Sequence, residues 1–101
     1  MNKIINGKKY DTDTATLIAE WSNNYSGSDF HYCQEELYRK RTGEYFLYGE
    51  GGSLSKYSKQ FRNGSVGDCH IEPFSEKEAK EWAEEHCDGD TYIEIFGDVE
   101  E

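Results

Sequence analysis

The feature that most constrains the fold is a pair of alternating segments on either side of Arg41-Thr42-Gly43. Residues 30–40 read FHYCQEELYRK, and residues 44–49 read EYFLYG. Their alternation has the two-residue period of β-strands, and Gly43 can adopt the positive φ that a tight turn requires. We therefore predict an antiparallel hairpin. Neither face of its first strand is cleanly apolar, since the faces comprise Phe30, Tyr32, Gln34, Glu36 and Tyr38 on one side, and His31, Cys33, Glu35 and Leu37 on the other.

Further strands are expected on both sides of this hairpin. Asn6-Gly7 favours the type I′ turn of a small N-terminal hairpin. The segment ATLIAEW (15–21) fits either a helical stripe or a strand, and its threonines favour the strand. The composition of residues 22–29 predicts a loop. CHIEPF (69–74) is a short strand that ends at the only proline.

The glycines that follow the central hairpin raise the question of a phosphate-binding loop. Such a loop needs glycines before a helix N-terminus, usually with a lysine. The segment GEGGSLSK contains Lys56 but lacks the required spacing, and Glu50 would repel a phosphate. We therefore predict that residues 49–68 form a long polar loop, with one helical turn around residues 54–61. Gly49, Gly51 and Gly52 would let the chain leave the hairpin at a sharp angle.

The clearest helix begins after Ser75. Ser75 and Glu78 have the spacing of a capping box, and Phe74 can pack against Ala79. The spacing i, i+3, i+4, i+7 makes a buried stripe of Ala79, Trp82, Ala83 and His86. GDTYIEIFG (89–97) fits a short helix capped by Asp90 and ended by Gly97, although TYIEIF also resembles a strand. DVEE (98–101) is a charged tail.

Together these elements predict a single α+β domain over residues 1–101. A small antiparallel β-sheet of hairpins would carry one main C-terminal helix, Ser75–Cys87, packed through Trp82. Hydrophobic residues make up only 35% of the chain, so we expect a small core. Formation of a homodimer, which would bury additional surface, is compatible with this composition. No apolar run or leader is present that would predict membrane insertion or export, so we expect a cytoplasmic protein.

The net charge of -10 is confined to the acidic C-terminal third, residues 72–101. Residues 1–71 contain nine acidic and nine basic side chains, whereas residues 72–101 contain twelve acidic side chains and two lysines. Such a block repels nucleic acid and attracts basic protein surfaces. We therefore expect no direct nucleic-acid binding.

Sites for chemistry are weakly indicated. Cys33, Cys69 and Cys87 each lie next to or near a histidine, but the spacing is not that of a zinc site, and no third group marks a nucleophile. We expect ordinary packing, no metal and no cofactor. Glu44 and Glu50 could form an acid pair, but nothing marks a cleft around them. The sequence therefore predicts a protein that is not an enzyme.

Four segments in this order resemble a family of small acidic proteins carried by phages and plasmids of Gram-positive bacteria. They are KKYDTDTATLI, LYRKRTGEYFLYGEGG followed by SKY, IEPFSEKEAKEWAEEH and a closing IFG. Members of that group are identified as anti-CRISPR proteins, which inhibit type II RNA-guided nucleases. The resemblance implies a type II CRISPR effector nuclease as the partner and inhibition by occupation of its guide RNA or target DNA site.

We expect the contact with that nuclease to use acidic side chains and hairpin tyrosines, namely Glu78, Glu81, Glu84, Glu85, Asp88, Asp90, Tyr38, Tyr45 and Tyr48. Two alternatives remain. One is a nucleic-acid-binding module that uses Arg39, Lys40 and Arg41, which the net charge opposes. The other is a homo-oligomeric accessory protein of a mobile element, without a nuclease target.

Overall fold

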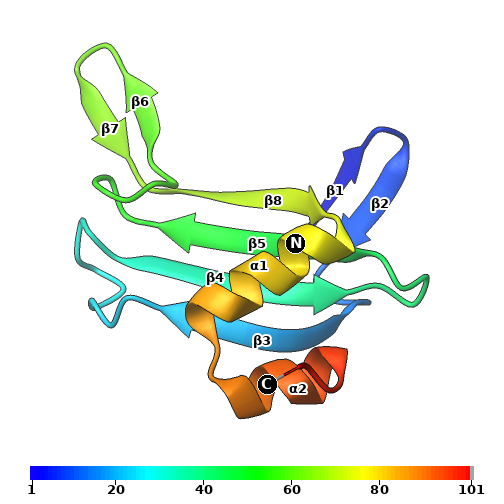
Figure 1. Cartoon of the computed structure of the whole chain (residues 1–101). Helices are drawn as coiled ribbons and strands as arrows, with labels where there is room; N and C mark the ends of the chain where they lie inside the picture. The colour runs from blue at the N-terminus through cyan, green and yellow to red at the C-terminus, as the bar shows by residue number, and fades with distance from the viewer. Residues whose placement is uncertain (101) are drawn as a thin grey trace.

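The computed structural model describes residues 1–100, which form a mixed α+β fold (Figure 1). Its strands and helices are β1 (Asn2–Ile5), β2 (Lys8–Asp11), β3 (Thr16–Ser22), β4 (Cys33–Arg39), β5 (Tyr45–Gly51), β6 (Lys59–Phe61), β7 (Gly64–Val66), β8 (Asp68–Phe74), α1 (Glu76–His86) and α2 (Gly89–Phe96). Four strands form an antiparallel sheet in the order β3-β4-β5-β8, and two hairpins stand apart from it. α1 crosses one face of this sheet (Figure 1). The predicted fold class is confirmed.

The central hairpin explains why neither face of its sequence pattern was cleanly apolar. Leu37 pairs with Leu47, and Tyr38 pairs with Phe46. Because successive side chains point to opposite faces, each pair contributes to a different apolar cluster. The helix-side cluster contains Leu37, Leu47, Ala79, Trp82 and Ala83, and the opposite cluster contains Tyr10, Tyr38, Phe46 and Ile71. Both faces of the sheet are therefore partly covered, one by α1 and the other by the N-terminal hairpin.

The other predicted strands are also present. Asn6 and Gly7 both have positive φ, 52° and 78°, as a type I′ turn requires. The ambiguous segment 15–21 is a strand, because it pairs with β4 along almost its whole length. Pro73 lies in β8, at the edge of the sheet. One side of an edge strand has no neighbouring strand, so a residue without an N–H group is tolerated there.

The prediction for residues 49–68 is wrong in its main part. β5 continues to Gly51, and β6 and β7 form a hairpin in place of the expected loop and helical turn. Arg62 and Asn63 make its turn, and Gly64 follows with a φ of 149°. This β6–β7 arm projects away from the sheet (Figure 1), and little of it is buried, so that even Phe61 and Val66 are exposed.

The glycines after the hairpin have a different role from the predicted sharp turn. Gly49 and Gly51 lie within β5, and none of the three has positive φ. A Cβ at Gly49 would overlap the ring of Tyr57, and one at Gly52 would lie 2.5 Å from the carbonyl oxygen of Phe30. Gly49 and Gly51 therefore allow residues 53–58, which we call the 53–58 loop, to pack directly on β5, and Gly52 allows close approach of the backbone at residues 29 and 30.

The helix predictions hold except for one cap. Ser75 and Glu78 form the complete capping box, and Ala79, Trp82 and Ala83 are buried as the stripe predicted. Residues 89–96 form a helix rather than a strand, but its N-cap is Asp88 and not Asp90. The extended backbone of Asp88 lets its carboxylate accept from the N–H of Thr91 at 2.8 Å. Glu101, the end of the predicted tail, lies outside the described residues.

Candidate functional site

A buried carboxylate lies between the sheet and α1. Glu35, in the middle of β4, has no exposed surface, although it is an acidic residue. The strand period places it on the same face as Leu37, directly under the helix. A buried charge is strongly unfavourable unless it is paired and hydrogen-bonded, so its partners decide what this position can do.

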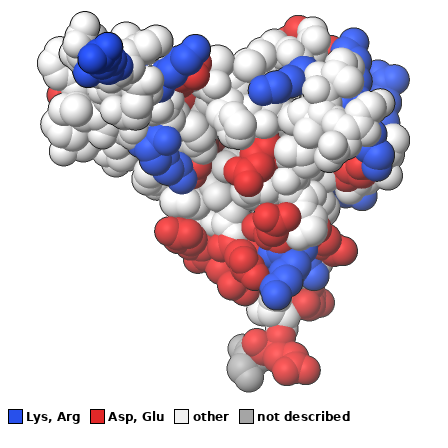
Figure 2. All heavy atoms as spheres, turned by 90° about the horizontal axis from the view of Figure 1, so that it is seen from above, with Lys and Arg blue, Asp and Glu red and all other residues white. Residues whose placement is uncertain are grey.

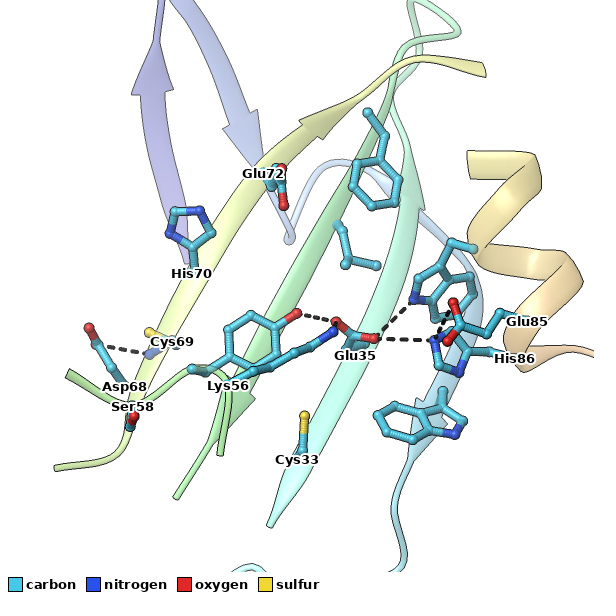
Figure 3. Close-up of a pocket in the computed structure, with 15 residues that line it drawn as sticks. Cys33, Glu35, Lys56, Ser58, Asp68, Cys69, His70, Glu72, Glu85 and His86 are labelled. Atoms are coloured by element: carbon cyan, nitrogen blue, oxygen red, sulfur yellow. Dashed lines mark hydrogen bonds and ion pairs between the residues drawn. The ribbon is translucent and has the colours of Figure 1, made fainter. Parts of the chain in front are cut away.

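The two oxygens of Glu35 are bound from opposite sides (Figure 3). Oε1 accepts from Trp82 Nε1 at 3.1 Å and lies 3.6 Å from His86 Nε2, so α1 holds this oxygen. Oε2 lies 2.8 Å from Lys56 Nζ and also accepts from the Tyr57 hydroxyl, so the 53–58 loop holds this second oxygen. One carboxylate thus connects β4, α1 and the 53–58 loop.

The protonation of these groups follows from this arrangement. Burial raises the pKa of the Glu35 carboxyl, but hydrogen bonds from Lys56, Tyr57 and Trp82 outweigh it and bring the pKa below its ordinary value. Burial and the hydrogen bond to Glu35 raise the pKa of the Tyr57 hydroxyl. Glu35 is therefore a carboxylate at neutral pH, and Tyr57 remains its hydrogen-bond donor.

Glu35 lies in the wall of an open groove of about 740 Å³ (Figure 3). We call this cavity the Glu35 groove. It is bounded by α1, by β8 and by the 53–58 loop, and its lining combines aromatic rings with several carboxylates. His86 lies between two indoles, with ring centroids 4.5 Å from Trp21 and 5.0 Å from Trp82. The groove therefore has an aromatic wall on the helix side.

Two cysteines and two histidines also line the groove. Cys33 lines it, but burial and the nearby Glu35 charge raise the pKa of its thiol, which disfavours the nucleophilic thiolate. The Cys69 thiol lies 3.7 Å from the sulfur of Met1, and His31 pairs with Asp29. Cys69, His70 and His86 also line the groove, whereas His31 and Cys87 do not. Within residues 1–100, no group of three or more His, Cys, Asp or Glu side chains could hold a metal ion.

The structure brings the predicted acidic residues together on α1 and at the start of α2. All six are exposed: Glu78, Glu81, Glu84, Glu85, Asp88 and Asp90. Two of them also have local roles, because Glu78 accepts from the N–H of Ser75 and Asp88 caps α2. Glu85 differs from the rest in lining the Glu35 groove.

The three predicted tyrosines do not form one surface. Tyr38 is buried and stacks on Phe46 with ring centroids 5.2 Å apart, and burial beside Glu36 raises its pKa to about 12. Tyr48 lies on the same side of the sheet and donates to Glu50 at 2.9 Å. Tyr45 points to the other side, toward α2. The strand period separates them, since 45 and 48 differ by an odd number.

The basic residues at the hairpin turn, and the two carboxylates considered as an acid pair, lie in different surroundings. The Lys40 ammonium lies 3.9 Å from the centre of the Tyr10 ring and 3.6 Å from Glu44, while Arg41 is exposed. Glu44 also pairs with Lys8 at the turn, whereas Glu50 accepts from Tyr48 and Tyr32. The structure therefore does not bring Glu44 and Glu50 together as an acid pair.

Sequence reasoning missed Glu35, Lys56 and Tyr57. The alternation did place Glu35 on the face of Leu37, so a charged residue on a buried face was the available signal. His86 was placed in the buried stripe of α1, but its proximity to Glu35 was not predicted. Lys56 and Tyr57 gave no comparable signal, because they belong to a segment that was predicted to be a loop.

Comparison with protein-family models, with curated proteins and with solved structures finds no match. Neither helix in the described part of the chain is long and apolar enough to cross a membrane.

Proposed function

We propose that the protein is an inhibitor that binds a type II RNA-guided nuclease and blocks loading of guide RNA or target DNA. It acts by occupying the site, without turnover, in the cytoplasm of the bacterial host. The observation that carries the proposal is the separation of charge in the molecule. Figure 2 shows Asp and Glu gathered where the helices lie, and Lys and Arg gathered mainly on the two lobes that hold the hairpins.

The chemistry of the partner fits this surface. RNA-guided nucleases hold nucleic acid in a positively charged channel. Carboxylates on a helix can bind the arginines and lysines that otherwise bind phosphates, because both pairings are charge-assisted hydrogen bonds. α1 is fixed on the sheet by Trp82 and its capping box, so its carboxylates are presented with little ordering cost. The resemblance to anti-CRISPR proteins supports the same partner.

The test is a cleavage assay with a type II nuclease and three orders of addition. The purified protein is added before guide RNA, after guide RNA, or after target DNA. Inhibition only before guide RNA means competition for the RNA channel, and inhibition up to DNA addition means competition for the target site. Absence of inhibition across several orthologous nucleases would contradict the proposal and favour an accessory protein of a mobile element.

Two matched variants locate the contact. In Glu81→Lys/Glu84→Lys/Glu85→Lys the charge of α1 is reversed while its capping box is kept, and we expect the concentration for half inhibition to rise about a hundredfold or more. Glu94→Lys/Asp98→Lys/Glu100→Lys changes the net charge equally but leaves α1 intact, and we expect a change of less than about fivefold. Equal losses would mean that the acidic helix is not the contact surface. Circular dichroism verifies that both variants are folded.

A further inference from the structure

We propose that the Glu35 groove receives an arginine side chain of a partner protein. The inference deepens the proposed function by naming the kind of residue that the partner inserts, and it rests on that function only for the partner's identity.

The groove carries an excess of negative charge. Four carboxylates line it, Glu35, Asp68, Glu72 and Glu85, against the single ammonium of Lys56. Lys56 is bound to Glu35 at 2.8 Å, so these two charges offset each other. Glu72 makes no ion pair with any described residue, and Glu85 has only His86 nearby, at 4.0 Å. The charge that remains in the groove therefore favours a cationic ligand.

The two unneutralised glutamates belong to different walls. Glu72 comes from β8 and Glu85 from α1, and Figure 3 shows them on opposite sides of the groove. Leu47 and Phe74 also line the cavity and supply apolar surface. A long side chain can lay its methylene groups on such a surface while its charged end reaches a carboxylate. This arrangement fits lysine or arginine better than a compact cation.

The aromatic wall favours arginine over lysine. Trp21, His86 and Trp82 form a row of rings along one side, and Tyr57 lies in the lining on the loop side. A guanidinium is planar, stacks on aromatic faces and is less strongly hydrated than an ammonium. It can also donate to more than one carboxylate oxygen from a fixed geometry.

The walls are held in place before any ligand binds. Glu35 binds Trp82 on one side and Lys56 and Tyr57 on the other, so it fixes the separation of the helix wall and the loop wall. A preformed site loses less conformational entropy on binding than one that must be assembled. Glu35 is therefore a positioning residue for the groove, and Glu72 and Glu85 are the residues that contact the ligand.

The experiment uses nuclear magnetic resonance with the full chain and no nuclease. The probe is a capped Gly-Gly-Arg-Gly-Gly peptide, with matched peptides that contain lysine or the neutral isostere citrulline. The protein has two tryptophans and both line the groove, so their indole N–H signals report occupancy directly. We expect the arginine peptide to shift both signals, the lysine peptide to bind more weakly and the citrulline peptide to cause no shift.

Two variants separate the groove from general electrostatic attraction. Glu72→Gln/Glu85→Gln removes the two ligand carboxylates, and we expect about tenfold weaker affinity for the arginine peptide. Glu81→Gln/Glu84→Gln removes the same charge from exposed positions outside the groove, and we expect less than about a twofold change. Equal weakening in the two variants, equal binding of the citrulline peptide, or equal binding of the lysine peptide would each overturn the proposal.

The outcome is independent of the nuclease assay. Arginine binding in the groove without inhibition would leave this inference standing and contradict the proposed function. Inhibition with no shift of the tryptophan signals would support the proposed function and overturn the groove as its arginine site.

Discussion

At the scale of single residues, Glu35 is the position where we expect a substitution to affect stability most, because it is a fully buried charge with partners on both oxygens. Its neighbours differ in exposure: the Lys56 side chain is 60% exposed, whereas Trp82 is buried. Removal of the carboxylate therefore leaves Lys56 free to enter water, but it leaves the Trp82 indole N–H and the Tyr57 hydroxyl without their acceptor. The cost of a change at Glu35 falls mainly on these two donors.

Glu35 is expected to make stability depend on pH in the acid range. Its pKa is lower in the folded protein than the ordinary value of 4.5, so below that pH the unfolded chain takes up the proton first. The free energy of unfolding therefore falls as pH decreases from about 4.5 through the folded-state pKa. Glu35→Gln should lose about 1–3 kcal/mol at pH 7 and show a flatter acid profile.

Urea unfolding at several pH values measures both effects. Glu44→Gln is the matched control, because this carboxylate also has a lowered pKa but lies in the turn, where solvent screens it. Its profile should remain close to that of the wild type. If Glu35→Gln leaves the acid profile unchanged, the Glu35 network does not contribute the stability assigned to it.

Single residues also show which structural roles can be predicted from sequence. Gly43, Ser75 and Glu78 were predicted correctly because each depends on neighbours within a few positions. The partners of Glu35 come from residues 56, 57, 82 and 86, and the strand period shows a face without showing what will cover it. The candidate site was therefore missed although its central side chain was placed on the correct face.

At the scale of elements, the 53–58 loop and β5 form one packed unit. We predict that Gly49→Ala will destabilise the protein by about 1–3 kcal/mol, because the added methyl group overlaps the Tyr57 ring and displaces it from Glu35. Gly27→Ala is the control, since its Cβ would meet nothing within 4 Å and its backbone has no positive φ. Its effect should stay within about 0.5 kcal/mol.

Thermal or urea unfolding compares these two glycine variants. Equal stabilities would mean that the close approach of Tyr57 is not required. The same region shows why the element prediction failed: β6 and β7 have only three residues each, so they are too short for the alternation that revealed β4 and β5.

At the scale of the whole molecule, the net charge of -10 should weaken the folded state at low salt. Raising ionic strength from about 0.01 M to about 0.15 M shortens the screening length from roughly 30 Å to roughly 8 Å. We predict that Tm will rise by about 4 °C over this range, as expected for about 1 kcal/mol in a domain of this size.

Differential scanning calorimetry tests this prediction. The control Glu84→Gln/Glu94→Gln/Glu100→Gln removes three exposed acidic charges, so it should start from a higher Tm and gain less from salt. A Tm that falls with salt would mean that attractive pairs such as Lys8–Glu44 outweigh the repulsion.

The sequence predicted the separation of charge between the two parts of the chain, because charge is additive and needs no fold. It did not predict that β8 pairs with β5 or that α1 and the 53–58 loop bound one groove, since those arrangements depend on contacts between distant segments.

The bridging position of Glu35 has a consequence for the order of folding. The β4–β5 hairpin can form from local contacts, but Glu35 then remains exposed to solvent until α1 packs on the sheet. Trp82, its partner on α1, is 47 positions further along the chain. Closing that long connection is slow compared with forming the hairpin. A partly folded chain with the sheet formed and the helix undocked keeps this carboxylate in water, and desolvation is favourable only when the helix and the 53–58 loop both close over it. Docking of these two segments is therefore cooperative, and amide hydrogen exchange should show them opening together.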